Sequence, residues 1–391
     1  MQSLAEIDGS YGEGGGQVLR TALVLSTITG RATRIHKIRA GRKIPGLAPQ
    51  HLTGVLAAAS IAGADVRGAE IGSTEVVFSP GKRGANERSY DFDVTEAARR
   101  GSAGSVTLVL QTILLPLALA GRSVGIRLRG GTHVAWSPPF DYFADVFLPA
   151  LSKMGVDAGC ALDAWGFYPV GGGEVSVRVA GVRWGAGLRA AAGVDSTIGV
   201  LPTGDLRSTA GEPDVAAGRS LRPLKLVERG EIVHVTGRAV VANLSKDIAD
   251  RMARRAEDVL SEKGIDSEVS SLRVGGKSTG AGVFLTARYA GSLAGFSALG
   301  KRGLPAERVA LDVCRELFAF HKTGAAVDAH LADQLVLPMS LAAGRSEMTV
   351  ERVTSHLMTS AHVIRQFVPA SIEIAGEEGE PGNVVVDGVA V

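Results

Sequence analysis

Residues 101–122 of the chain read "GSAGSVTLVLQTILLPLALAGR", and nearly the same pattern occurs again at 324–345 as "GAAVDAHLADQLVLPMSLAAGR". A third version is found near the amino terminus, where "ALVLSTITGRATRIHKIRAG" (22–41) resembles "TILLPLALAGRSVGIRLRGG" (112–131). Each version is an apolar run of helical character that ends in Gly-Arg, and the two at 22–41 and 112–131 continue into an alternating strand. Internal similarity of this kind predicts a repeat architecture.

The similarity extends outward from these helices. "PGLAPQHLTGVLAAASIAGADV" (45–66) and "SPPFDYFADVFLPALSKMGVDA" (137–158) share a proline turn, a helix, a glycine stop and a strand. We therefore expect an α/β (α+β) fold built from three pseudo-symmetric units.

Residues 185 to about 290 interrupt the repeats. The stretch 185–220 is rich in Gly and Ala, which is typical of a loop or linker. Residues 224–274 then predict two strands, a charged amphipathic helix and a further strand. We therefore divide the chain into 1–184 (large domain, repeats one and two), 185–290 (inserted small α/β domain with its linker) and 291–391 (large domain, third repeat).

The composition excludes several classes of protein. The net charge of the 391 residues is only +2, which argues against wrapping nucleic acid but allows the protein to grip one end of it. Cys160 and Cys314 lie far apart and support neither a disulfide framework nor a zinc site. The most apolar stretch, 106–120, is too short to span a bilayer. Because no signal peptide is evident, we expect a cytoplasmic protein that does not enter a membrane.

The glycine-rich stretch "GSYGEGGGQVLRT" (9–21) follows a predicted strand and opens a predicted helix. No lysine follows the glycines as in a P-loop, and Gln17 stands where a dinucleotide fingerprint has its last glycine. A glycine loop at a helix start nevertheless presents backbone N–H groups to an anion. Arg20 can add two further hydrogen bonds to the same anion.

Aligning the three copies on their Gly-Arg pairs brings Arg20, Gln111 and Gln334 to one structural position. Coincidence, or polar positions on exposed helix faces, would explain this without any function. The alternative is that three pseudo-symmetric helices aim these side chains at a shared centre, where buried polar groups need partners.

Basic residues are concentrated in "RATRIHKIRAGRKIPGLAPQHL" (31–52). Arg39 and Arg42 flank a glycine at the end of a predicted strand, and Gln50 and His51 open the next helix. These residues together would bind a second phosphate. A solvated edge strand, where Lys and Arg are common, is the alternative interpretation.

Two histidines near the carboxyl terminus are placed for chemistry. His330 and Asp333 lie on one face of the helix that "DAHLADQL" (328–335) opens. His356 lies in "TSHLMTS" (354–360), and "SHL" follows the third repeat as "QHL", which contains His51, follows the first. A single histidine is more often structural than catalytic, so this parallel is what favours His356.

These stretches together resemble the RNA 3'-terminal phosphate cyclases over nearly the whole chain. The matching segments are "DGSYGEGGGQVLRT", "IRAGRKIPGLAPQHL", "AGSVTLVLQT", "GGTHVAWSPPFDYF", "GFYPVGGGEV", "HLADQLVLPMSLA" and "SHLMTS". The resemblance implies three βαβαββ-like repeats with a small α/β domain inserted before the third. It also implies a ligase-type enzyme that uses ATP to convert an RNA 3'-phosphate to a 2',3'-cyclic phosphate.

The resemblance also assigns roles to individual residues. His356 falls on the nucleophile that takes AMP as a phosphoramidate. Glu13 would bind a metal ion, Mg²⁺ or Mn²⁺. The residues that would hold ATP are Gln111, His330, Leu331, Ala332, Asp333 and Gln334, and those that would bind phosphate and the RNA end are Arg20, Arg39, Arg42, Gln50 and His51.

The sequence departs from the family at a few positions. Val170 stands where a basic residue is expected, which would weaken one RNA contact, and His330 replaces an aromatic residue found in some relatives. The stretch 185–220 is also longer than usual.

Several alternatives stay open. A non-catalytic scaffold in ribosomal RNA processing would keep the fold and lose the nucleophile. A lysine nucleotidyltransferase needs K-x-D-G, but Glu6 stands in the lysine position of "EIDG". An enolpyruvyl-transferase-like enzyme would form no protein–AMP adduct, and an RNA-end-binding module would not consume ATP. The sequence leaves the physiological RNA, the preferred metal and the oligomeric state open, and a homodimer is among the possible states.

Overall fold

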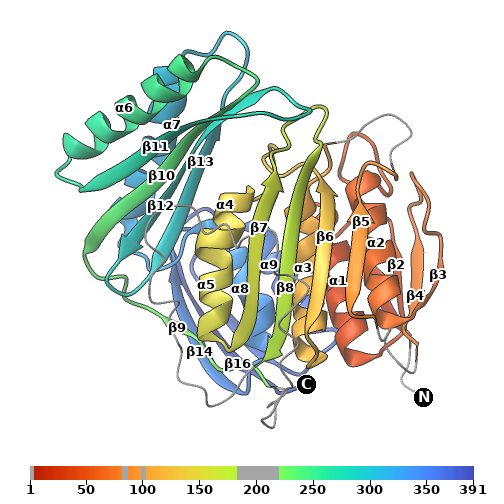
Figure 1. Ribbon diagram of the computed structural model, residues 1–391. Helices are drawn as coiled ribbons and strands as arrows, with labels where there is room; N and C mark the ends of the chain where they lie inside the picture. Colours follow the sequence, from red (N-terminus) through yellow and green to blue (C-terminus); the bar gives the residue numbers. More distant parts are fainter. Residues whose placement is uncertain (1–3, 82–86, 98–102, 183–219) are drawn as a thin grey trace.

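The computed structural model describes residues 4–81, 87–97, 103–182 and 220–391 (Figure 1). The first repeat runs through β1 (Ala5–Asp8), α1 (Gly16–Thr29), β2 (Thr33–His36), α2 (Pro49–Ala62), β3 (Asp65–Arg67) and β4 (Val76–Ser79). Its sheet has the order β1-β2-β4-β3, with β1 and β2 parallel. Left-handed glycines, Gly30 and Gly63, end the two helices as the sequence predicts.

The second repeat follows the same plan. It comprises β5 (Ser89–Asp93), α3 (Val106–Leu119), β6 (Val124–Gly130), the continuous helical run α4 (Phe140–Tyr142), η1 (Phe143–Phe147) and α5 (Leu148–Lys153), then β7 (Val156–Ala164) and β8 (Gly173–Val182). The strand order β5-β6-β8-β7 matches that of the first sheet. Helix α3 is almost entirely buried, which confirms that the most apolar stretch is a core helix.

The third repeat is split by the insertion. It comprises β9 (Lys225–Leu226), α8 (Ala329–Ser340), β14 (Gly344–Val350), α9 (Ser355–Ile364), β15 (Ser371–Ala375) and β16 (Gly382–Gly388). Strand β9 pairs in parallel with β14, as β1 does with β2, so it is the first strand of this repeat. The inserted domain therefore lies inside the third repeat, after its first strand, and not before the repeat as the sequence suggested.

The inserted domain contains β10 (Ile232–Ala242), α6 (Lys246–Ser261), β11 (Ser267–Val274), β12 (Gly280–Tyr289), β13 (Leu293–Leu299) and α7 (Ala306–Thr323). Its sheet has the order β11-β10-β12-β13. β13 and α7 belong to a second hydrophobic core that continues to Ala325. The boundary expected at residue 290 must therefore move toward α8. The linker expected at 185–220 lies almost wholly outside the described residues.

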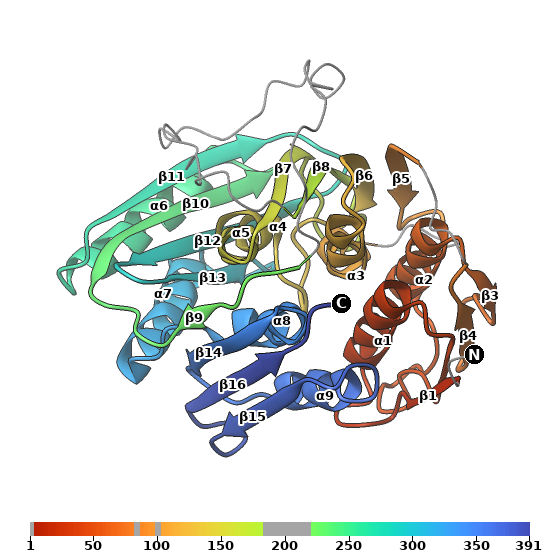
Figure 2. The same ribbon diagram turned by 90° about the horizontal axis from the view of Figure 1, so that it is seen from below.

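The three repeats share one hydrophobic core, in which their helices meet. Figure 2 shows the three sheets around the outside, with α1, α2, α3, α8 and α9 between them. Helix α1 packs against α3 of the second repeat and α9 of the third, and α9 packs against α8. Residues from all three repeats can therefore reach a common centre. Among the described helices, none is both long and apolar enough to cross a membrane.

Candidate active site

The glycine-rich loop between β1 and α1 lies along the start of α9. Gly12 and Gly14 adopt left-handed conformations. A Cβ atom at Gly12 would collide with Oγ1 of Thr359, and one at Gly14 would lie 2.7 Å from the backbone nitrogen of Gly41. Only glycine allows these close approaches. No side chain caps the amino terminus of α1, so its first N–H groups remain available to an anion.

Glu13 joins this loop to α9 and to the basic segment after β2. Its carboxylate accepts a hydrogen bond of 2.6 Å from Ser355 Oγ and one of 3.0 Å from Arg42 Nη2. Burial raises the pKa of Glu13, but the Ser355 bond and the charges of His356 and Arg42 outweigh it and leave the pKa below its usual value. Glu13 is therefore a fixed negative charge beside His356.

His356 lies in the first turn of α9, the helix that Thr354 caps. Its Nδ1 is 3.4 Å from Oε2 of Glu13, and 40% of its side chain is exposed. Burial lowers the pKa of His356, Glu13 raises it, and Arg20, Arg42 and His330 lower it further, with a net downward shift. The imidazole is therefore neutral at pH 7. With Nδ1 turned to Glu13, Nε2 is the nitrogen free to react.

Arg20, Gln50 and His51 line a small cavity together with Leu108 and Thr112. Burial lowers the pKa of Arg20 to about 10, and burial together with three neighbouring arginines lowers the pKa of His51 to about 3. Gln50 accepts a hydrogen bond of 3.0 Å from the backbone nitrogen of Ser105. The cavity thus combines a buried cation with a neutral imidazole, which suits an anionic ligand.

The basic segment is not an edge strand. Its strand, β2, lies between β1 and β4, so that alternative is wrong. Arg39 follows β2 with a positive φ and donates a hydrogen bond of 2.7 Å to the carbonyl of Gly46. Burial and the neighbouring Arg42 lower the pKa of Arg39. Like charges held together in this way favour a bound anion.

The predicted ATP residues on α8 divide into two groups. His330 is exposed and lies near enough to His356 to lower its pKa. Asp333 is buried against Thr354, and burial raises its pKa to about 8. Leu331 and Ala332 point into the hydrophobic core, so their side chains do not face the site.

Unpaired polar atoms are concentrated on the predicted residues. Of the eight buried side-chain nitrogen and oxygen atoms without a hydrogen-bond partner in the described residues, four belong to Arg20, His51, Gln111 and Gln334, and a fifth to Thr359. The equivalent positions of the three repeats, Arg20, Gln111 and Gln334, each contribute one. Because their atoms are buried, exposed helix faces do not explain them. Buried polar groups are normally paired, so a polar ligand would complete them.

Glu13 is the one residue that the resemblance assigns to a metal ion. No cluster of three or more His, Cys, Asp or Glu side chains that could hold a metal ion is found in the described ranges. Mg²⁺ is commonly held by one or two carboxylates together with the phosphates of a substrate. The residues therefore fit a metal ion that arrives with a nucleotide, and they do not fit an independent metal centre.

Sequence reasoning missed the residues that support this site. Ser355 holds Glu13, Thr354 holds Asp333, and Gln17 donates hydrogen bonds to Ser360 (3.0 Å) and accepts one from Arg20 (2.5 Å). The pattern of a Thr before a helix could have indicated Thr354 as a cap. No local pattern indicates the contacts of Ser355 with Glu13 and of Gln17 with Ser360, because each joins segments more than 300 residues apart.

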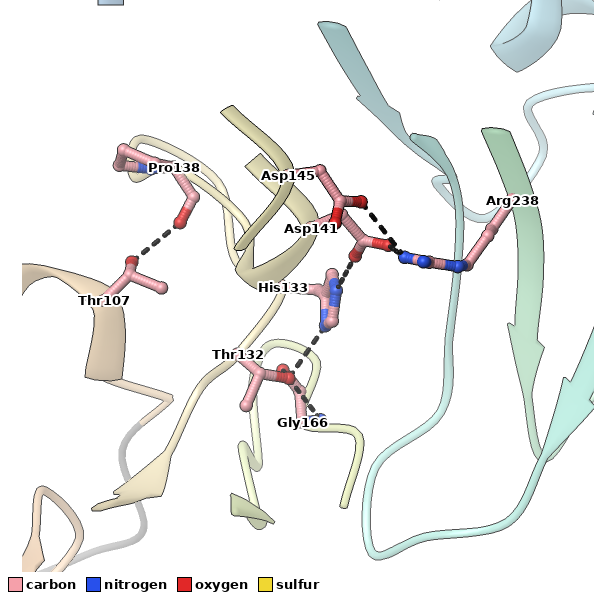
Figure 3. Close-up of polar contacts among 8 residues, drawn as sticks. All are labelled: Thr107, Thr132, His133, Pro138, Asp141, Asp145, Gly166 and Arg238. Carbon is pink, nitrogen blue, oxygen red and sulfur yellow. Dashed lines mark hydrogen bonds and ion pairs between the residues drawn. The ribbon is translucent and has the colours of Figure 1, made fainter. Parts of the chain in front are cut away.

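A second histidine cluster lies between the second repeat and the inserted domain (Figure 3). His133 Nε2 is 2.7 Å from Asp141, whose other oxygen binds Arg238 of β10. Thr132 Oγ1 lies 2.8 Å from His133 Nδ1, and Arg238 also reaches Asp145 at 3.5 Å. His133 is fully buried and stacks on Trp165 at 4.3 Å between ring centroids. This cluster joins the second repeat to the inserted domain, and no role for its residues was predicted from the sequence.

Comparison with known proteins supports the resemblance to the RNA 3'-terminal phosphate cyclases. The RNA 3'-terminal phosphate cyclase family matches residues 11–374. The RNA 3'-terminal phosphate cyclase of Methylococcus capsulatus is 47% identical over 386 residues, which are 99% of this chain and 97% of that protein. That of Archaeoglobus fulgidus is 40% identical over 96% of this chain and 99% of its own length. The chain belongs to the RNA 3'-terminal phosphate cyclase family.

Proposed function

We propose that this protein converts the 3'-terminal phosphate of an RNA to a 2',3'-cyclic phosphate, with ATP as cosubstrate and His356 as the covalent carrier of AMP. The observation that carries the proposal is the state of His356. Its imidazole is half-exposed, neutral at pH 7, oriented by Glu13, and close to the positive charges of Arg20 and Arg42. A neutral imidazole held beside a carboxylate is a competent nucleophile.

In the first step Nε2 of His356 attacks the α-phosphorus of ATP. A P–N bond forms as the bond to the bridging oxygen of the β-phosphate breaks, and pyrophosphate leaves. The ring gains positive charge, which Glu13 stabilises through Nδ1. Arg20 and Arg42 offset the negative charge of the departing pyrophosphate.

In the second step an oxygen of the RNA 3'-phosphate attacks the same phosphorus and breaks the P–N bond, so that AMP passes to the RNA end. The neighbouring 2'-hydroxyl then attacks the 3'-phosphorus, loses its proton and expels AMP. A phosphate monoester is a poor electrophile, and capping it with AMP supplies a good leaving group. Because the attacking group is a 2'-hydroxyl, only RNA-like ends can cyclise.

The remaining residues bind and orient the substrates. ATP would be held by Gln111, His330, Asp333 and Gln334, with Leu331 and Ala332 contributing only backbone, and the phosphates of ATP and RNA by Arg20, Arg39, Arg42, Gln50 and His51. The unpaired atoms on Arg20, His51, Gln111 and Gln334 support this assignment, because a phosphorylated nucleotide offers them partners. Glu13 would contact Mg²⁺ or Mn²⁺, which would neutralise phosphate charge.

The test is incubation of the protein with ATP labelled at the α-phosphate and a divalent metal, without RNA. The proposal predicts label that survives denaturation and alkali, is lost in mild acid, and is absent from His356→Ala. Lability in acid with stability in alkali is the signature of a phosphoramidate. If the wild-type protein takes no label in the absence of pyrophosphate, the cyclase mechanism fails and a non-catalytic scaffold becomes the better explanation.

A further inference from the structure

Two aromatic rings stack on one another at the edge of the active site. Tyr11, in the glycine-rich loop, lies parallel to His362 of α9, with 3.6 Å between ring centroids and 8° between planes. Tyr11 is 43% exposed. The ring is therefore held in a fixed plane and still reaches solvent.

The loop that carries this ring continues to the nucleophile. Gly12 packs on Thr359, and Glu13 contacts both Ser355 and His356, so the loop follows α9 from His362 back to its first turn. The six residues from His356 to His362 span about 9 Å of helix. A nucleotide bound with its phosphate at His356 would place its base at about this distance from His356.

The chemistry of the stacked pair suits a nucleobase. His362 covers one face of Tyr11, and no other ring of the described residues stacks on the second face. Burial, and then the charge of Arg365, lower the pKa of His362, which keeps its ring neutral at pH 7. Exposed aromatic planes bind unpaired bases by stacking, with little dependence on sequence. The positive Arg365 lies one turn further along α9, where it would attract a phosphate backbone.

We infer that Tyr11, held by His362, is a stacking platform for the 3'-terminal base of the RNA substrate. The inference rests on the proposed function, in which the phosphate of that nucleotide reaches His356. RNA is favoured over the adenine of ATP because the residues proposed to hold ATP lie on α3 and α8, whereas Tyr11 approaches α9 from the first repeat. Tyr11 is a positioning residue, since it contacts the base and not the reacting atoms.

The test uses RNA with a 3'-phosphate and 2-aminopurine as its last base, whose fluorescence falls when it stacks. The wild-type protein should quench the probe. Tyr11→Ala should weaken binding about tenfold, equivalent to about 1.4 kcal/mol, and abolish the quench. Tyr11→Phe should bind within about twofold of wild type, and His362→Ala should show an intermediate loss. The matched control carries 2-aminopurine many nucleotides upstream, where no variant should change its signal.

Self-adenylylation by labelled ATP separates this inference from simpler explanations. If Tyr11 only anchored the loop, Tyr11→Ala would displace Glu13 and slow RNA-free adenylylation as much as it weakened RNA binding. If Tyr11 is a stacking platform, Tyr11→Ala should change adenylylation by less than about twofold, because stacking contributes only to binding of the RNA base. The fluorescence is read without turnover, so it remains decisive even if His356 takes no AMP. Full quenching and unchanged affinity in Tyr11→Ala would overturn the inference.

Discussion

His356 and His133 each lie beside a carboxylate and an arginine, but the two clusters are built in opposite ways. The side chains of His356, Glu13 and Arg42 are 40%, 39% and 46% exposed, and the imidazole is 3.4 Å from the carboxylate. His133 is fully buried, its Nε2 is 2.7 Å from Asp141, and Thr132 faces its other nitrogen. One histidine keeps a nitrogen free, and the other has both nitrogens engaged.

A histidine–carboxylate pair therefore does not identify a reaction by itself. Around His356 the neighbouring side chains carry unpaired polar atoms, so the site is incomplete without a ligand. Around His133 the partners are satisfied and three aromatic rings, Trp165, Phe167 and Phe284, exclude solvent. The first arrangement favours chemistry, and the second holds the inserted domain to the second repeat.

The largest expected effect is that of removing the nucleophile. His356→Asn should reduce formation of the protein–AMP adduct by more than about 1,000-fold, because among the described residues His356 supplies the only imidazole paired with Glu13. The melting temperature should hardly change, since the side chain is half-exposed. Labelling with ATP and a thermal melt measure the two effects. A large fall in melting temperature would mean that His356 is structural after all.

Removing the buried histidine should have the reverse effect. His133→Ala removes one hydrogen-bond partner from each of the buried side chains of Asp141 and Thr132, although Arg238 and Gly166 still contact them. Loss of a buried partner typically costs about 1–3 kcal/mol of unfolding free energy. Urea unfolding should show this loss, whereas the fraction that remains folded should still form the AMP adduct. If stability were unchanged and adenylylation were lost, the His133 cluster would have the functional role, and the roles assigned to the two clusters would be wrong.

Replacing Arg20 should affect stability and ATP binding in opposite directions. Its Nε is buried without a partner, and burial lowers its pKa to about 10. Arg20→Met should therefore leave the unfolding free energy unchanged or raise it by about 1 kcal/mol, while weakening ATP binding about tenfold or more. Calorimetric titration with ATP and urea unfolding test the two halves. A variant that loses stability and still binds ATP normally would contradict the assignment.

The last prediction concerns Asp333 and the dependence of stability on pH. Burial raises the pKa of Asp333 in the folded protein to about 8, above the usual pKa of an aspartate in the unfolded chain. At a pH between these two pKa values the carboxyl is protonated when folded and ionised when unfolded, so unfolding releases a proton. The wild type should lose stability relative to Asp333→Asn as pH rises from about 4 to about 8, and the difference should be constant above that. A difference that does not depend on pH would show that the carboxyl is already ionised in the folded protein.

The repeat fold could be predicted because its signal is long and periodic. Three apolar helices with Gly-Arg ends, such as Val106–Leu119, are visible without any structure. The place of the insertion could not be predicted, because β9 has only two residues, Lys225–Leu226, and its partner β14 comes after the inserted domain. β13 and α7 fall in the part of the chain that the sequence assigned to the third repeat, and only the pairing of β13 with β12 and the packing of α7 on α6 place them in the inserted domain.

The same contrast between local patterns and distant contacts holds for the candidate site. Arg20, His51 and His356 could be found because each occupies a marked position in a repeat. Contacts such as that of Ser355 with Glu13 depend on how segments distant in sequence pack, and no local pattern encodes them. Leu331 and Ala332 were included because they lie between site residues in sequence, but a helix turns them into the core.

The measurement that tests the central contrast most directly is location of the AMP group itself. The wild-type protein is incubated with ATP and a divalent metal, digested under alkaline conditions that preserve a phosphoramidate, and its peptides are analysed by mass spectrometry. We predict AMP on the peptide that contains His356 and none on the peptide that contains His133. AMP on any other residue, or on none while pyrophosphate is removed, would contradict the account.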